Sequence, residues 1–240
     1  MARAAFLPHP LTGAGASNVI YLGAALCRRK FELFYPDGFE DETYLVAERS
    51  HKERAHLDWE TELAPATFRK LLARGEFRAI SDAAVRVEAR ANLLFSFERM
   101  ALRDAVKTPA GARLFATELY AFLYGHGSLQ RRFSDWIEAL QDLPQRKSKV
   151  LTWPVATVFG FIARPDRHMF CKPRATRKAA RDYGYALSSR TQPTWADYQD
   201  LLTFAAVLRR DLDRKPGFKA RDMIDLQSFM WVQGAAEYQA

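Results

Sequence analysis

The chain has 240 residues, of which 48% are apolar, and it carries a net charge of +8 from 36 basic and 28 acidic side chains. This apolar fraction can support a buried core, and the sequence contains no stretch near the roughly 18 apolar residues that a membrane span needs. The pattern of a signal peptide is also missing. The two cysteines, Cys27 and Cys171, lie far apart, which argues against a disulfide framework and indicates a cytoplasmic protein.

The first part of the chain is predicted to be a series of helices. Residues 41–63 contain no Gly or Pro and predict one helix. A short helix is predicted over 65–73, because Pro is favoured at a first helical turn, and Gly75 is predicted to close it. Ser81 is predicted to cap a single long and largely buried helix over 83–106.

Two further helices are predicted before residue 145. Leu114, Phe115 and Leu119 recur at helical spacing, and Gly125 is predicted to end that helix in the left-handed conformation. Ser128 is predicted to cap the next helix, whose apolar face includes Phe133 and Trp136. This face is the cleanest amphipathic pattern of the chain, so we expect both aromatic rings to be buried.

A change in charge suggests a division of the chain. Residues 1–144 hold 19 basic and 19 acidic side chains, whereas residues 145–240 hold 17 and 9. The polar and basic segment 145–149 follows Pro144, so it is the best candidate for a boundary. We therefore predict a charge-balanced helical region over 1–144 and a basic α+β region over 145–240, and one continuous domain is left open as an alternative.

The second part is predicted to contain a β-hairpin. Residues 155–163 are rich in Val, Thr, Phe and Ile, the segment 164–167 has the composition of a turn, and residues 168–171 are again apolar. Thr194 is predicted to cap a helix, and a short last helix is predicted from Asp222. The predicted fold class is therefore α+β, predominantly α-helical.

The most informative motif is a basic helix between the predicted hairpin and Tyr183. Arg174, Arg177, Lys178 and Arg181 are spaced by three and four residues, which places them on one helix face. Like charges at this spacing repel weakly, so an anion against them relieves a cost. A solvated helix face without a ligand is the competing interpretation.

The surrounding sequence strengthens the prediction of an anion surface. Residues 146–190 hold 11 basic side chains against only Asp166 and Asp182, which is the kind of local charge that attracts nucleic acid, DNA or RNA. Aromatic residues near these cations are predicted either to stack on bases or to pack in the core. The predicted nucleic-acid-binding residues are Lys172, Arg174, Arg177, Lys178, Arg181, Arg164 and Arg167. The aromatic candidates are His168, Phe170, Tyr183 and Tyr185.

Two alternative functions use the same charge. One is an enzyme that acts on a nucleotide or another anionic small molecule, and the other is an interaction module for an acidic protein partner. Glu48, Lys52 and His56 share a helix face at steps of four and are the first acid/base candidates. Their more ordinary interpretation, an exposed surface with ion pairs, is the one that we predict.

The remaining candidates for chemistry are weaker. Asp222 and Asp225 are expected to pair with Arg221 and other arginines rather than to hold a cation, and His168 is a further enzyme candidate. His51 and His56 are five residues apart and so face different sides of a helix, which argues against a shared zinc ion. No metal or cofactor is therefore predicted, and the catalytic residues of any enzyme stay unknown.

Overall fold

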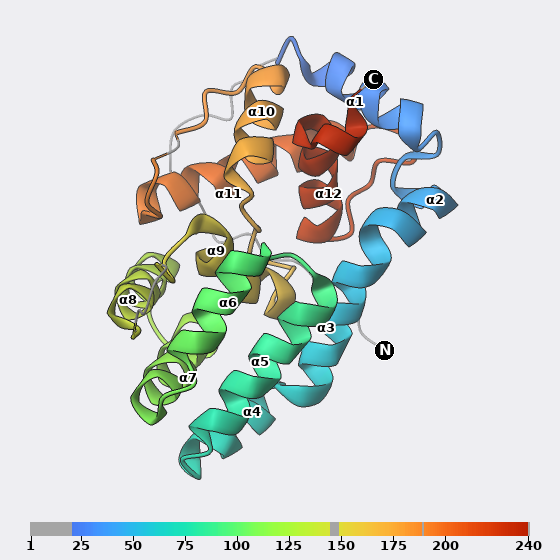
Figure 1. Cartoon of the computed structure of the whole chain (residues 1–240). Helices are drawn as coiled ribbons and strands as arrows, with labels where there is room; N and C mark the ends of the chain where they lie inside the picture. Colours follow the sequence, from blue (N-terminus) through green and yellow to red (C-terminus); the bar gives the residue numbers. More distant parts are fainter. Residues whose placement is uncertain (1–20, 145–148, 189, 240) are drawn as a thin grey trace.

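The computed structural model describes residues 21–144, 149–188 and 190–239, and none of these residues forms a strand. The chain is a stack of helices (Figure 1). In chain order these are α1 (Ala24–Phe34), η1 (Gly38–Glu40), α2 (Glu42–Tyr44), η2 (Leu45–Arg49), α3 (Ser50–Glu62), α4 (Pro65–Ala73), α5 (Phe77–Ala91), α6 (Ser96–Ala105), α7 (Pro109–Tyr124), α8 (Leu129–Asp142), α9 (Trp153–Ala163), α10 (Pro173–Tyr183), α11 (Trp195–Leu212), α12 (Met223–Gly234) and η3 (Ala236–Tyr238).

The helices form two groups, which contact each other between α8 and α11 and between η2 and α12. Helices α3 to α8 make up the lower part of the view in Figure 1, and α1, α10, α11 and α12 make up the upper part. Helix α9 packs against α3, α5, α7 and α8, although it comes from the second half of the sequence. Helix α1, from the first half, packs against α10 and α12. Contacts therefore cross the predicted boundary near residue 145 in both directions, and residues 145–148 themselves lie outside the described part.

The predicted β-hairpin is wrong, because its first segment is the central helix α9. All eleven residues of α9 are buried, and the Oγ1 atom of Thr152 caps it by accepting the N–H of Val155. A short apolar run rich in Val, Ile and Phe is typical of a buried strand and of a helix that is buried on every side, so periodicity alone cannot separate the two. Pro154 lies in the first turn, where proline favours a helix.

The second segment of the predicted hairpin, residues 168–171, has no regular secondary structure and pairs with no strand of the described residues. The N–H of Met169 donates to the Tyr198 hydroxyl at 3.2 Å, and the N–H of Cys171 donates to Thr157 Oγ1 at 3.0 Å. Side chains therefore satisfy the buried backbone groups that a hairpin partner would have satisfied. His168 and Phe170 in this segment are buried.

The helix predicted over 83–106 is two helices. Asn92 adopts the left-handed conformation (φ 53°) and ends α5, and α6 begins at Ser96 in a new direction. Asn and Gly are the residues that tolerate this conformation best. Ser81 is not a cap: it lies buried inside α5, and its hydroxyl donates to the Phe77 carbonyl. Gly125 ends α7 with an extended rather than a left-handed backbone.

Other local predictions are confirmed. Helix α4 begins at Pro65, and Gly75 after it has a φ of +70°. The Ser128 and Thr194 side chains accept backbone N–H groups at the starts of α8 and α11. Phe133 and Trp136 are fully buried in α8, as their amphipathic pattern predicts. Within the described residues, every helix is too short or too polar to cross a lipid bilayer.

Candidate nucleic-acid interface

Helix α10 is anchored by one face of small residues. Ala175, Thr176, Ala179 and Ala180 are buried against α12 and α1. The closest approach is at Gly234 of α12, where an added Cβ would lie 2.3 Å from Ala175 backbone atoms. Small side chains on both helices allow this separation, and they leave the opposite face of α10 directed to solvent.

The opposite face carries the predicted cations. Arg174, Arg177 and Arg181 are exposed, and Lys178 is half-buried. Successive residues of a helix are about 100° apart, so these four positions fall within an arc of about 100°. The Arg174 and Arg181 Cα atoms are separated by about 10 Å along the helix axis at 1.5 Å per residue. The four predicted positions therefore share one face of α10, as their spacing requires.

The cations of this surface differ in how far they are neutralised. Lys178 forms an ion pair with Asp182, and the guanidinium of Arg181 lies 3.8 Å from the same carboxylate while remaining 75% exposed. Arg174 and Arg177 form no ion pair with any carboxylate of the described residues. Both side chains are thus exposed without a counterion in the part of the chain that the structure describes, which is a favourable condition for binding an external anion.

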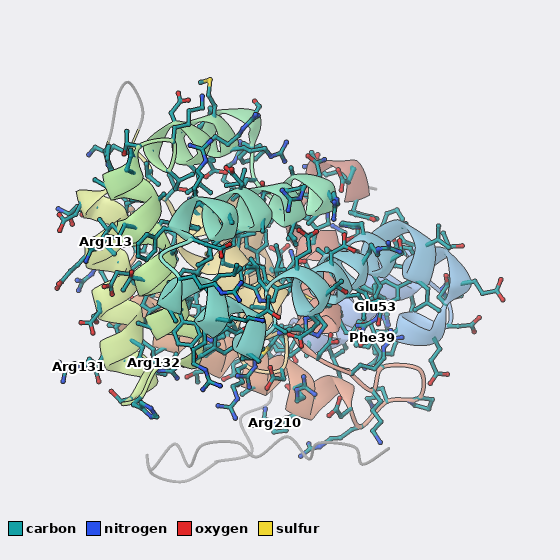
Figure 2. All side chains as sticks on the ribbon, turned by 90° about the horizontal axis from the view of Figure 1, so that it is seen from below. Phe39, Glu53, Arg113, Arg131, Arg132 and Arg210 are labelled. Atoms are coloured by element: carbon teal, nitrogen blue, oxygen red, sulfur yellow. The ribbon has the colours of Figure 1, made fainter. Side chains whose placement is uncertain are left out.

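Two other predicted site residues lie apart from this face. Arg164 and Arg167 follow α9, and both contact the carboxylate of Asp166, at 3.0 and 3.3 Å. Both cations act on Arg132 of α8. Burial lowers the pKa of Arg132, and the positive charges of Arg167 and Arg164 lower it further. Figure 2 places Arg132 with Arg131 and Arg113 along one edge of the molecule as seen from below. The titratable neighbours that act on Arg164 are Asp166, Tyr124 and Glu60, and none of them belongs to α10.

Lys172 connects α10 to the aromatic pair Phe95 and Phe97, which lies in the helix that was predicted to be largely buried. Its ammonium nitrogen lies 3.8 Å from the centroid of the Phe95 ring, a cation–π contact. Phe95 stacks on Phe97 with ring centroids 5.8 Å apart. Burial lowers the pKa of Lys172, and the charges of Glu98 and Glu88 oppose that effect. Both phenylalanine rings are 54% exposed.

A signal for this exposed pair exists in the sequence. Residues two apart on a helix are about 200° apart around it, so Phe95 and Phe97 could not both face the core of the single helix predicted over 83–106. Asn92, a frequent left-handed residue, marks the break between the two helices. The aromatic residues that were predicted as stacking candidates behave differently: His168, Phe170 and Tyr183 are buried.

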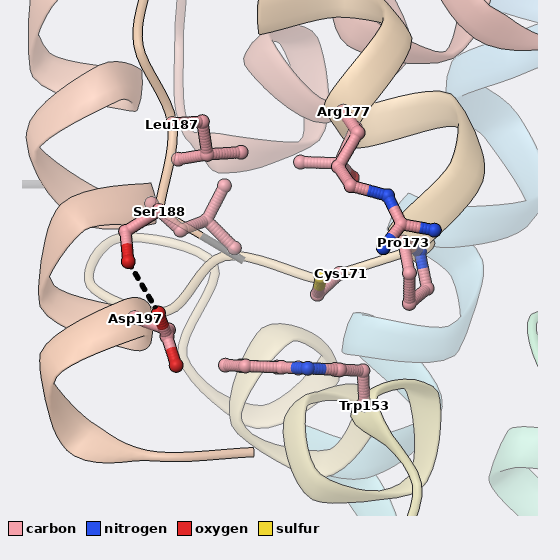
Figure 3. A pocket seen from close by; sticks show the side chains of 9 residues that line it. Trp153, Cys171, Pro173, Arg177, Leu187, Ser188 and Asp197 are labelled. Carbon is pink, nitrogen blue, oxygen red and sulfur yellow. Dashed lines mark hydrogen bonds between the residues drawn. The ribbon is translucent and has the colours of Figure 1, made fainter. Parts of the chain in front are cut away.

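A small cavity lies between α10 and α11. Figure 3 shows Arg177 and Pro173 on its α10 side, Ser188 and Asp197 on the opposite side, and the Trp153 ring below. Its volume is about 10 Å³, which is space for about one water molecule. The Ser188 hydroxyl donates to Asp197 across one wall at 2.6 Å. A substrate of nucleotide size does not fit this space.

The thiol in this cavity is unreactive. Cys171 is buried, and burial raises its pKa to about 12. Cys27 is also a free buried thiol with a pKa raised to about 11 by burial, and the nearby Asp182 charge adds to the effect. A thiol is a nucleophile only as the thiolate, so neither cysteine supplies catalytic chemistry in this arrangement.

The first enzyme candidates are not exposed, which corrects their prediction. Glu48 and Lys52 are 5% and 4% exposed, and Lys52 donates to Glu48 Oε2 at 2.9 Å and to Ser228 Oγ at 2.8 Å. Burial lowers the pKa of Lys52, and Glu48 opposes that effect. His56 is directed elsewhere, with Nδ1 2.8 Å from the carbonyl oxygen of Ile162. The three groups therefore do not converge on one reacting position.

A second buried cluster surrounds Asp225 of α12. Its carboxylate accepts hydrogen bonds from the Tyr44 hydroxyl at 2.6 Å, from Arg49 at 2.9 Å and from Arg221 at 2.9 Å. Burial acts to raise the pKa of Asp225, but the hydrogen bonds from Arg221 and the charge of Arg49 hold it below its usual value. Asp222 also pairs with Arg49, at 2.8 Å. The expectation that these carboxylates pair with arginines is confirmed.

The backbone explains how η2 brings these charges to α12. The segment Leu45–Arg49 is a π-helical turn, which has one more residue per hydrogen-bonded ring than an α-helix. Glu48 and Arg49 are both buried by this turn, although the surrounding sequence has the charge of a surface helix. Both side chains take part in the buried network with α12.

Comparisons with known proteins add no assignment to these observations. No family model matches the chain, and no curated protein or solved structure is significantly similar to it.

Proposed function

We propose that this protein binds nucleic acid through the exposed face of α10. The observation that carries the proposal is that Arg174 and Arg177 are exposed on one helix face with no ion-pair partner among the described residues, beside Arg181 and Lys178. Phosphate contacts by such cations release counterions and supply most of the sequence-independent affinity for nucleic acid. Three exposed arginines along about 10 Å of helix are far enough apart to contact more than one phosphate of a strand.

The test removes this face and keeps the fold. Arg174, Arg177, Lys178 and Arg181 are replaced by Gln, and binding to a fluorescent oligonucleotide is measured by anisotropy at several salt concentrations. We expect affinity to fall sharply, and the slope of log K against log salt to flatten by about 0.9 per lost contact on duplex DNA and about 0.7 on a single strand.

A matched control separates this surface from the total charge of the protein. Arg69, Lys70, Arg74 and Arg78 are exposed cations of α4 and α5, at the end of the molecule opposite to α10 (Figure 1). Their replacement by Gln removes the same four charges, and we expect a much smaller loss of affinity. Equal losses in the two variants, or unchanged binding in the α10 variant, would contradict the proposal.

A further inference from the structure

An exposed aromatic pair adjoins the N-cap of α10, where the chain enters the helix that carries the four cations. Phe95 and Phe97 are each 54% exposed, and Met100 one turn further along α6 is 56% exposed. The two rings are nearly parallel, with an interplanar angle of 12°. Large apolar side chains are usually buried in a soluble domain, so three of them exposed within six residues mark a surface that contacts something else.

The surrounding structure holds this pair in a fixed position. Glu98 accepts the N–H of Phe95 at 3.0 Å and the Thr152 hydroxyl at 2.8 Å. One residue earlier, the N–H of Leu94 donates to buried Glu88 at 2.8 Å. Both carboxylates that lie under the aromatic pair are thus buried and hydrogen-bonded. They hold the loop between α5 and α6 and present little negative charge at the surface.

Lys172 joins the aromatic pair to the phosphate-binding face. Its ammonium group contacts the Phe95 ring, and it precedes Arg174 by two residues at the start of α10. A flat ring surface therefore lies beside the N-terminal end of the helix that carries Arg174 and Arg177. Proteins that bind single strands combine these two elements, because every base has a face that stacks on an aromatic ring and every nucleotide has a phosphate.

We propose that Phe95 and Phe97 stack on unpaired bases of a single-stranded nucleic acid whose phosphates contact Lys172 and the exposed face of α10. This inference rests on the proposed function of α10 and names the class of nucleic acid that it takes. A duplex keeps its base faces stacked internally, so it offers the cations their phosphates but offers the rings no partner.

The test compares three probes of equal length at one salt concentration. They are an oligothymidylate strand, the corresponding duplex, and an abasic strand that keeps the sugar–phosphate backbone without bases. We expect the oligothymidylate to bind more tightly than the abasic strand by roughly 5- to 150-fold for each stacked base, the range that base–aromatic stacking supplies. The duplex is expected to bind more weakly than the oligothymidylate.

Two variants separate stacking from simple hydrophobic contact. Phe95→Leu with Phe97→Leu keeps apolar side chains and removes the rings, so the advantage of oligothymidylate over the abasic strand should disappear. Phe95→Tyr with Phe97→Tyr keeps the rings and should retain that advantage. Because all four changes are at exposed side chains, both variants are expected to fold, which a thermal melt checks.

The outcomes distinguish the two proposals. If the abasic strand binds as tightly as oligothymidylate to the unmodified protein, or if the Leu variant keeps the difference, the stacking inference is overturned and binding through α10 stands. If the duplex binds more tightly than the single strand, the inference is also overturned. If none of the probes binds even at low salt, the proposed function itself fails.

Discussion

Two clusters of basic residues in this chain are alike in sequence and opposite in environment. Around α12, Arg49 and Lys52 are almost fully buried, and each has at least one carboxylate partner within 3 Å. On α10, Arg174 and Arg177 are exposed, and neither forms an ion pair with any residue that the structure describes. The first cluster is part of the packing of the fold, whereas the second is free to bind an anion. A count of charges along the chain does not separate them.

The largest effect is expected from breaking the buried cluster. Asp225 is fully buried and receives hydrogen bonds from Arg49, Arg221 and Tyr44. Asp225→Asn leaves Arg49 with less compensating charge in a buried site, and removal of one partner from such a pair costs about 3–5 kcal/mol. Denaturant unfolding monitored by circular dichroism measures this loss of stability.

The control for that change is Asp182→Asn, which removes the partially exposed partner of Lys178 on α10. Exposed ion pairs contribute about 0–1 kcal/mol, so this variant should unfold near the midpoint of the unmodified protein. If both variants lost the same small amount of stability, the contrast between the two clusters would be wrong.

A second prediction concerns the buried histidine near the other arginines. His168 is 2% exposed, and burial, with the charges of Arg132 and Arg164, lowers its pKa from 6.5 to about 3. The unfolded chain therefore binds a proton between pH 6.5 and 3 that the folded chain does not bind, so stability is lost as pH falls through this window. The loss from this residue should reach about 2 kcal/mol at pH 5.

His168→Gln tests this prediction, because Gln does not titrate and can still hydrogen-bond to the Tyr198 hydroxyl, which lies 3.1 Å from His168 Nδ1. The variant is expected to be less stable at pH 7, since His168 packs against Phe122 with centroids 4.8 Å apart. Its stability should, however, change less between pH 7 and pH 5 than that of the unmodified protein. Parallel pH profiles of the two proteins would contradict a neutral buried imidazole.

The smallest effect on stability is expected on α10. Replacement of Arg174 and Arg177 by Gln changes exposed side chains that form no ion pair with a described residue, so each should alter the free energy of unfolding by less than roughly 0.5 kcal/mol. A thermal melt measures this directly. A large loss of stability would mean that these arginines support the fold, which would remove the contrast with the buried cluster.

Prediction from sequence was most successful where the determining residues are close in the chain. The caps by Ser128 and Thr194 and the start of α4 at Pro65 depend on groups within three residues of each other, and all are found in the structure. The prediction over 155–163 failed because an apolar run fits a buried strand and a buried helix equally well. Which of the two forms depends on the helices that surround α9.

The residues of the candidate site also fall into those that local geometry predicts and those that it does not. The common face of Arg174, Arg177, Lys178 and Arg181 follows from helical geometry and could be predicted from their spacing. The separation of Arg164 and Arg167 from that face could not be predicted, because it depends on the path of the chain between α9 and α10. The same spacing argument placed Glu48 and Lys52 at the surface, and the structure buries both against α12.

The sequence by itself therefore determined the helical character of most segments, the caps at Ser128 and Thr194, and the alignment of the cations on α10, because these depend on local backbone geometry. Tertiary structure alone decided which charges are neutralised and which apolar rings remain exposed. Asp225 reaches Arg49 across 176 positions of the chain, and Lys172 reaches Phe95 across 77. Contacts of this kind depend on how distant helices pack, which no local pattern specifies.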